Sequence, residues 1–348
     1  MSGGTAVFLQ NREFFGAMIV HVPLLFALRR LAEGTPLVVY SPFERGRLFE
    51  SIGLADETRV WTRKKRAIGA SEDASHTGLP ALIGELRSRR FHRVLSLRPQ
   101  SADIIAATAS SGAAERIGYR TLLSRFALTS SVPRDTTVYR AVNYLNLLGE
   151  LDPSAMFVES MAHLARNAHG AAAVAPGAYC LMPCGSEPPK LWGESNFIAL
   201  ARAIVERDPS ARFLLVIGEG ERRYVELFAR EGLGSRTSAL VGGSLPEIAR
   251  AVLDARVVVA NDCGPSHVAQ IAGAPIVSIF GNWDGRARVR IAEWFHPRPG
   301  ARCVTTAAPA PVQTLGVEPV LAEVGRLLEE PRARGGTVEV PARVAAMP

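Results

Sequence analysis

The chain has 348 residues, of which 47% are hydrophobic and 21% are charged, and its formal net charge is +7. This length exceeds what one hydrophobic core usually supports, so two domains are expected. An aromatic content of 7%, without a nucleic-acid recognition motif, argues against a nucleic acid as the partner.

The first half alternates strand-like apolar runs with helical periods. Strands are predicted at 6–9, 37–40 and 94–97, and helices at 17–32 and 102–109. This alternation is typical of a parallel sheet with crossover helices.

The rhythm restarts after an Ala-rich, polar stretch at 163–177, which we interpret as an interdomain linker. We therefore predict a first domain over 1–172 and a second over 173–330. Residues 331–348 mix Pro, Arg, Gly and Ala without an apolar period, and a frayed tail is expected there.

The second half is predicted to begin with a strand at 178–182, a loop at 183–193, a helix at 195–207 and a strand at 212–217. The Ser-x-x-Glu spacing of Ser244 and Glu247 predicts a capping box. The elements that follow are a helix at 245–255, a strand at 257–260, a helix at 265–272 that ends at Gly273, and a strand at 275–280. Both halves therefore predict an α/β protein of two doubly wound, Rossmann-like domains.

No membrane span or metal site is expected. The most apolar stretch, 14–28, is interrupted by His21 and Pro23 and is shorter than the roughly 20 residues that cross a bilayer. No secretory signal is apparent, and the cysteines lack the paired spacing of a zinc site. We expect a cytoplasmic protein with reduced thiols at Cys180, Cys184, Cys263 and Cys303.

The positive charge is concentrated in the first half. Residues 1–170 hold 21 Lys and Arg against 15 Asp and Glu, whereas the remainder holds 19 against 18. This excess predicts either an acidic substrate or membrane surface as the partner, or a solvated basic face. The basic runs are Arg63-Lys64-Lys65-Arg66 and the group Arg87, Arg89, Arg90, Arg93 and Arg98.

The strongest candidate site follows the predicted strand at 257–260. Asn261 and Asp262 end this strand, and the next helix begins within Cys263-Gly264-Pro265. Ligands gather at the carboxyl ends of strands in open α/β sheets, and a helix N-terminus there attracts phosphate. Asp262 and His267 are therefore candidate ligands for a sugar or ribose; alternatively, Asp262 is a helix cap and His267 a satisfied polar group.

Two further loops carry candidate residues. Lys190, held by two prolines, is placed to neutralise a diphosphate leaving group, and Ser186 to donate to the same oxygens. Glu219 and Glu221, after the strand at 212–217, are candidates for binding ribose hydroxyls, or belong to a solvated turn.

Three segments resemble glycosyltransferase family 9, the heptosyltransferases of lipopolysaccharide core assembly. NDCGPSHVAQIAGAPIVSIFG at 261–281 resembles the family signature. The loop PCGSEPPKLWGESNFIALARAI at 183–204 is similar to its proline-glycine and Lys-x-Trp segment, and Glu115-Arg116-Ile117-Gly118-Tyr119 to its Arg-Ile-Gly element. The similarity covers about residues 5–325.

The resemblance implies a GT-B fold, with an acceptor-binding first domain facing a donor-binding second domain across a cleft. It implies inverting transfer of a sugar from a nucleotide donor, most often ADP-heptose, without a bound metal or cofactor. The acceptor would be an acidic glycolipid at the inner face of the cytoplasmic membrane. The implied donor contacts are Ser186 and Lys190 to the diphosphate, Glu219 or Glu221 to the ribose, and Asp262, Cys263, Gly264, Pro265 and His267 to the sugar and phosphates.

The chain departs from the family where a general base is expected. The family usually has Gly-Asp six residues before the proline that corresponds to Pro23, and this chain has Gly16-Ala17. Glu13 and His21, four residues to either side of Ala17, are the candidate replacements, with Glu13 slightly favoured. Each also has a structural interpretation without catalysis. Glu13 is then a carboxylate at the start of a helix, and His21 a polar interruption of an apolar helix.

A second departure lies at Asn282-Trp283-Asp284-Gly285, where the family has Thr and Pro. The bulky Trp283 is expected to affect which sugar fits. Two alternative functions stay open: a non-catalytic nucleotide-sugar-binding protein that has lost its base, and a nucleotide-sugar epimerase of the same two-lobed architecture.

Overall fold

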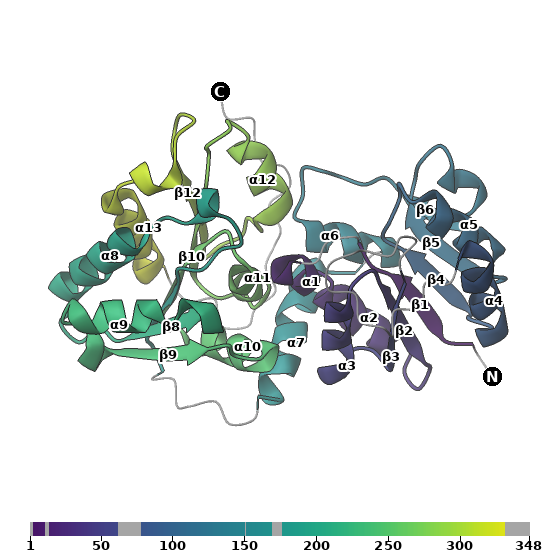
Figure 1. Cartoon of the computed structure of the whole chain (residues 1–348), viewed down its shortest axis with the longest axis horizontal. Coiled ribbons are helices and arrows are strands. Elements are labelled where there is room, and N and C mark those ends of the chain that lie inside the picture. The colour runs from purple at the N-terminus through teal and green to yellow at the C-terminus, as the bar shows by residue number, and fades with distance from the viewer. Residues whose placement is uncertain (1–2, 11–13, 62–77, 150, 169–175, 331–348) are drawn as a thin grey trace. The chain divides into compact units, whose positions relative to one another are not determined.

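The computed structural model describes residues 3–10, 14–61, 78–149, 151–168 and 176–330. The chain forms two compact units, Met1–Leu151 and Asp152–Pro348. Each is a parallel α/β unit whose strands lie inside a surround of helices (Figure 1). None of the helices in these residues is long and apolar enough to cross a membrane.

The first unit is built on a six-stranded parallel sheet of order β3-β2-β1-β4-β5-β6. Its strands are β1 (Thr5–Phe8), β2 (Leu37–Ser41), β3 (Glu57–Val60), β4 (Arg93–Ser96), β5 (Glu115–Tyr119) and β6 (Ser130–Val132). Its helices are α1 (Phe15–Ile19), α2 (Val22–Leu31), α3 (Leu48–Ser51), α4 (Leu79–Arg89), α5 (Ala102–Ser110) and α6 (Arg140–Leu145). Short 3-10 turns are η1 (Glu44–Arg47), η2 (Ser124–Phe126) and η3 (Asn146–Leu148).

The helix predicted at 17–32 is divided into α1 and α2. Pro23 lies in the first turn of α2, where its missing N–H costs no hydrogen bond. The chain therefore starts a new helix at Val22 instead of continuing α1, and His21 becomes the residue that precedes it.

The second unit repeats the architecture, with strand order β12-β11-β10-β7-β8-β9. Its strands are β7 (Tyr179–Met182), β8 (Phe213–Ile217), β9 (Thr237–Val241), β10 (Val257–Asn261), β11 (Ile276–Phe280) and β12 (Ala301–Thr305). Its helices are α7 (Pro153–Arg166), α8 (Glu194–Arg207), α9 (Arg223–Arg230), α10 (Leu245–Asp254), α11 (Gly264–Ile271), α12 (Ala287–Trp294) and α13 (Val317–Glu329). Its 3-10 turns are η4 (Pro188–Lys190), η5 (Glu219–Glu221), η6 (Gly234–Arg236) and η7 (Val312–Thr314).

The units divide between Leu151 and Asp152, and not near residue 172 as composition suggested. The intervening α7 packs against α10 and α11 of the second unit. Its buried residues Phe157, Met161 and Leu164 recur at helical spacing, so this helix has an apolar face to bury. Residues 163–166, predicted as linker, are its last turn.

Local signals set several boundaries in the second unit as predicted. The Ser244 hydroxyl accepts a hydrogen bond from Glu247 N, and the Glu247 carboxylate accepts one from Ser244 N at 2.8 Å, which is the predicted capping box. Gly273, after α11, has φ of +73°, the left-handed conformation that lets the chain turn into β11.

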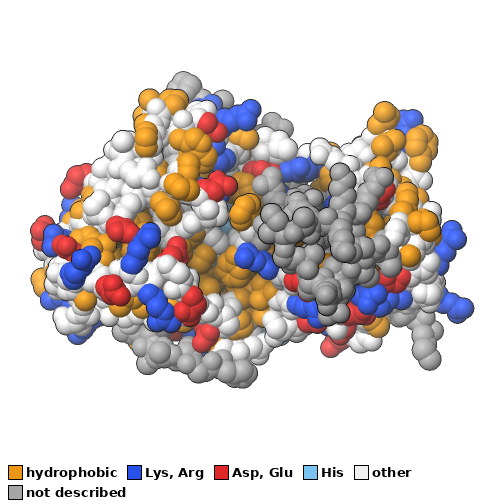
Figure 2. Space-filling model, viewed as in Figure 1, with side chains coloured by type: hydrophobic (Ala, Val, Ile, Leu, Met, Phe, Trp, Pro, Cys, Tyr) orange, Lys and Arg blue, Asp and Glu red, His pale blue; other side chains and the backbone are white. Residues whose placement is uncertain are grey.

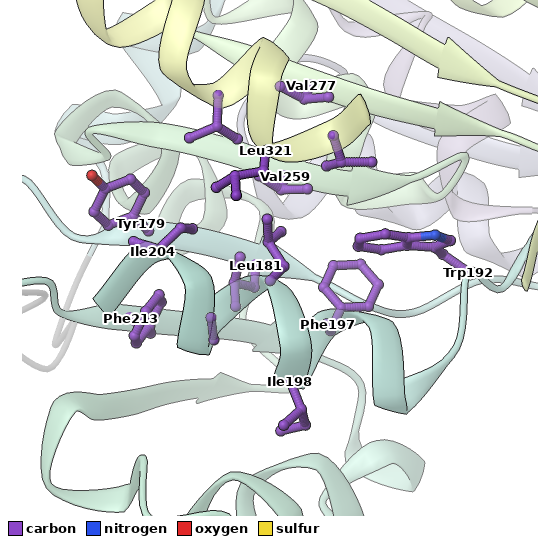
Figure 3. Close-up of a cluster of buried hydrophobic side chains, with 14 of the residues drawn as sticks. Tyr179, Leu181, Trp192, Phe197, Ile198, Ile204, Phe213, Val259, Val277 and Leu321 are labelled. Carbon is purple, nitrogen blue, oxygen red and sulfur yellow. The ribbon is translucent and has the colours of Figure 1, made fainter. Parts of the chain in front are cut away.

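The core of the second unit lies between its sheet and helices α8 and α13. Trp192, fully buried, packs edge to face on Phe197 with ring centroids 5.1 Å apart. Figure 3 shows these two rings beside Leu181 of β7, with Val259, Val277 and Leu321 in the same cluster. This apolar support fixes the segment that leads from β7 to α8.

Candidate functional site

The candidate site lies at the carboxyl edge of the second sheet. Strands β7 and β10 pair in parallel, with Met182 opposite Ala260. The loops that follow these two strands are therefore neighbours, although they are far apart in sequence. One contains Ser186 and Lys190, and the other leads into α11.

Asn261 ties these two loops together. Its side chain is fully buried, and its Nδ2 donates a 2.7 Å hydrogen bond to the Pro183 carbonyl. Its Oδ1 accepts a 3.2 Å bond from Trp192 N, and the Trp192 indole donates to Leu315 O at 2.7 Å. One amide thus fixes both ends of the loop that carries Lys190. No role was predicted for Asn261, although a polar residue at the end of a buried strand is a usable signal.

Lys190 and Asp262 meet at this edge. The Lys190 Nζ lies 3.2 Å from the Asp262 Oδ2, and their side chains are 24% and 8% exposed. Lys190 ends the turn η4, whose proline carbonyl at Pro188 also accepts from Gln313 Nε2. Two residues predicted separately are therefore one charged unit beside the start of α11.

The N-terminus of α11 begins at Gly264, with Cys263 in extended conformation before it. Ser266 Oγ donates to Cys263 O at 2.7 Å and accepts from Cys263 N at 3.4 Å. Pro265 occupies the first turn, as its missing N–H allows. Unpaired amides and the helix dipole at such an end favour an anion.

Two buried thiols, those of Cys184 and Cys263, lie in the same two loops. Cys184 and Cys263 form a side-chain hydrogen bond, which together with burial raises the pKa of Cys184. Burial and the charge of Asp262 raise the pKa of Cys303 to about 12, and burial raises that of Cys180. Within residues 3–10, 14–61, 78–149, 151–168 and 176–330, no group of three His, Cys, Asp or Glu is arranged to hold a metal.

The other predicted donor contacts occupy the same edge with different surroundings. Ser186 is exposed, beyond Cys184 on the β7 loop. Glu221 accepts from Gly218 N at 2.9 Å after β8, and Glu219 pairs with Arg222 at 2.7 Å. Both carboxylates therefore shape the turn η5, with Glu219 exposed and Glu221 half-buried.

His267 faces the protein interior. It is 3% exposed, its Nδ1 lies 3.3 Å from Gln270 Nε2, and its ring centroid lies 5.4 Å from that of Trp294. This surrounding matches the satisfied polar group that was the alternative to a ligand role.

Of the two candidate bases of the first unit, His21 is among the described residues. Glu13 lies outside the described residues. His21 is 1% exposed and stacked on Tyr144 at 4.7 Å, and its Nδ1 donates to the Met18 carbonyl at 3.3 Å. Burial lowers the pKa of His21 to about 3, against the opposing effect of that hydrogen bond. Ala17, in the position of the family aspartate, is also buried, at 5% exposure.

The described residues include part of the charge difference predicted between the two halves. On the face in Figure 2, acidic and basic side chains of the second unit are intermingled, in keeping with its near balance of charge. Arg63-Lys64-Lys65-Arg66 lie outside the described residues. Arg89 and Arg93 form ion pairs with Glu57 and Glu115, at 2.6 and 2.5 Å, so part of the second basic group is neutralised locally.

Solved structures resemble the chain over its length. The E. coli heptosyltransferase WaaC with ADP has a TM-score of 0.66 at 16% identity, covering 93% of this chain and 99% of that one. E. coli ADP-heptose lps heptosyltransferase II has a TM-score of 0.60 at 16% identity, with 93% and 98% covered. UDP-GlcNAc 2-epimerase from Methanocaldococcus jannaschii has a TM-score of 0.55 at 11% identity, with 97% and 94% covered.

At these identities the likeness shows the fold, which is that of the GT-B heptosyltransferases, and does not by itself separate a transferase from an epimerase. No curated protein matches the chain's sequence. The model of glycosyltransferase family 9 (heptosyltransferase) matches residues 81–288, which include β4 and β5 of the first unit and the site from Lys190 to His267. The chain therefore belongs to glycosyltransferase family 9 and is a glycosyltransferase by family.

Proposed function

We propose that this protein transfers a heptose or related sugar from a nucleotide-sugar donor, first of all ADP-heptose, to a lipopolysaccharide core or other glycan acceptor, with inversion at the anomeric carbon. The observation that carries the proposal is the Lys190–Asp262 pair beside the N-terminus of α11. A partly exposed ammonium and the positive end of a helix dipole are the groups that a diphosphate needs.

The proposed chemistry assigns one task to each group. The acceptor hydroxyl attacks the anomeric carbon as the bond to the donor phosphate breaks, and the leaving nucleoside diphosphate gains negative charge. Lys190 and the α11 amides stabilise that charge. Asp262 holds the Lys190 amino group in place, while Ser186 contacts the phosphates and Glu219 or Glu221 the ribose. Cys263, Gly264 and Pro265 shape the backbone against which the phosphates lie.

The acceptor proton needs a base, and we propose Glu13 for this role. His21 is disfavoured because its imidazole is buried and hydrogen-bonded to the Met18 carbonyl. A base must reach the proton that it removes. His267 is proposed to support the donor site from inside, through its contacts with Gln270 and Trp294.

We further propose that the reaction takes place in the cytoplasm, at the inner face of the membrane that holds the acidic glycolipid acceptor. The excess of Lys and Arg in residues 1–170 supports an acidic acceptor. No step of the proposed chemistry draws on a metal or a cofactor.

Calorimetry with ADP, UDP and GDP tests the donor site. We expect selective binding of ADP that is weakened in Lys190→Ala and in Asp262→Ala, and unchanged in the surface control Arg230→Ala. No binding of any nucleotide would contradict the proposal. Equal binding of all three would leave a donor site without the proposed preference for adenine.

A second measurement separates the enzyme from a non-catalytic relative, which Ala17 in the place of the family aspartate favours. Release of ADP from ADP-heptose is followed with a heptose-deficient lipopolysaccharide acceptor. Turnover that is lost in Glu13→Gln and kept in His21→Gln supports the transferase with the proposed base. ADP binding without turnover in the unaltered protein supports the non-catalytic relative.

A further inference from the structure

The segment between β5 and β6 presents large apolar side chains to solvent. Leu122, Leu123 and Phe126 are 74%, 62% and 79% exposed. Single exposed apolar residues are ordinary, but three within one short connection form a patch. We call residues 120–126 the apolar-basic segment.

Hydrogen bonds hold this segment in its exposed form. Ser124 is buried, and its Oγ donates to Tyr119 O at 2.8 Å and accepts from Thr121 N at 2.7 Å. Thr121 Oγ1 accepts from Ser124 N at 3.0 Å. The buried serine therefore anchors a compact turn to the end of β5, with Leu122, Leu123 and Phe126 left outside. Their exposure follows from the turn geometry.

The charge around the patch has one sign. Between Glu115 and Asp135 the chain has Arg116, Arg120, Arg125 and Arg134 and no acidic residue. Arg120 and Arg125 are exposed, and the Arg125 guanidinium lies over the Phe126 ring at 4.4 Å. In Figure 2, hydrophobic and basic side chains lie together at the end of the first unit near which Figure 1 labels β6.

We propose that the apolar-basic segment docks the protein on an anionic lipid surface. Leucine and phenylalanine side chains enter the boundary between headgroups and acyl chains, and arginines at their base meet lipid phosphates, which is the arrangement of interfacial segments. A specific protein partner typically needs about 800 Å² on each side, far more than one turn offers. A membrane needs no such complementary outline.

Docking on lipid deepens the proposed function and rests on it in one respect. A lipid surface matters to this protein because the proposed acceptor is a glycolipid. The segment follows the carboxyl end of β5, the edge of the first sheet at which a ligand of an open α/β sheet is expected. Docking there would bring that edge of the first unit to the lipid headgroups.

Sedimentation with vesicles tests the docking. The protein is mixed with phosphatidylcholine vesicles, with or without phosphatidylglycerol. We expect binding to the anionic vesicles that falls at least about tenfold in L122S/L123S/F126S, because three apolar side chains no longer leave water. The matched control is L31S/V289S, which removes apolar side chains that are 55% and 65% exposed elsewhere and should bind as the unaltered protein does. R120E/R125E should weaken binding to anionic vesicles, with R230E as its control.

Two readouts decide between outcomes. The far-UV circular dichroism and the urea unfolding curve of L122S/L123S/F126S should equal those of the unaltered protein, which shows that the variant is folded. Vesicle binding without any nucleotide binding would refute the donor site and leave the docking intact. Equal vesicle binding by this variant and by the unaltered protein overturns the docking proposal. The docking proposal is also overturned if L122S/L123S/F126S changes its oligomeric state on size exclusion while its vesicle binding stays the same. The patch would then contact a second copy of the chain.

Discussion

Lys190 and Asp262 form an ion pair that joins the ends of two neighbouring strands, with 3.2 Å between Nζ and Oδ2. Each residue lies in a loop that Asn261 holds by hydrogen bonds to Pro183 and Trp192. The amino group is therefore fixed before any donor arrives, which lowers the cost of ordering it on binding. This pair is the part of the site on which the donor-binding predictions depend.

Removal of the Lys190 charge should weaken ADP binding. A hydrogen bond to a charged group contributes about 1.5–3 kcal/mol, so Lys190→Ala should raise the dissociation constant of ADP by about ten- to a hundredfold. Lys190→Arg retains the charge and should lose less. Calorimetry at fixed salt measures both, and an unchanged affinity in Lys190→Ala would remove this residue from the donor site.

Asn261 should be a large contributor to stability. Asn261→Ala leaves Pro183 O and Trp192 N without their buried partner, and each such loss costs about 1–3 kcal/mol. We expect urea unfolding to show a free energy of unfolding lower by about 2–4 kcal/mol. The exposed Asn146→Ala is the control and should stay within about 0.5 kcal/mol of the unaltered protein. A similar value for both variants would show that the clamp carries no net stability.

His21 should make the first unit less stable in acid. Its pKa is lowered to about 3 in the folded protein against an ordinary value of 6.5, so between these values the unfolded chain binds the proton more tightly. Stability is then unaffected above pH 6.5 and falls as the pH drops toward 3, by about 2 kcal/mol at pH 5. Urea unfolding at pH 7 and pH 5 measures this loss.

The variant His21→Phe tests the assignment of that pH dependence. It keeps a ring against Tyr144 and has no proton to bind, so the loss between pH 7 and pH 5 should shrink by about the same 2 kcal/mol. Burial lowers the pKa of His296 to about 4, so this residue causes a separate loss of stability in acid in the second unit. The variant His296→Phe is the comparison for His21→Phe. An identical pH dependence with and without His21 would contradict its burial as a neutral imidazole.

Bound ADP should protect Cys263 from alkylation. This thiol precedes α11, where the proposal places the phosphates, and it is 7% exposed. We expect iodoacetamide to label Cys263 more slowly when ADP is present, as followed by mass spectrometry of its peptide. Cys180, which is fully buried in strand β7 of the same sheet, reports unfolding and should show little labelling in either condition. Equal labelling of Cys263 with and without ADP counts against phosphates at α11.

Local patterns predicted most of the elements that carry the site. The alternation of apolar runs and helical periods indicated β7, α8, β8, α10, β10, α11 and β11 within a few residues of their ends. The capping box at Ser244 and the left-handed Gly273 were readable because both depend on neighbours within four residues. The family signature at 261–281 identified the family, which the match over 81–288 confirmed.

Composition failed where a helix resembled a linker. The alanine-rich stretch around residue 163 suggested a boundary near 172, yet α7 buries Phe157, Met161 and Leu164 against the second unit. Strand β9 and the short β6 escaped prediction, because none of their residues is buried and the alternation of apolar and polar residues is weak.

Periodicity, capping and motif are properties of adjacent residues, so they were enough to predict the α/β fold, the strand ends with their loops, and the family. The contact of Lys190 with Asp262, the hold of Asn261 on both loops and the burial of His21 against Tyr144 exist only in the folded chain and were not predictable from it unfolded. These contacts depend on which strands pair and which faces pack. Such choices are made by the burial of the whole chain, not by any one segment of it.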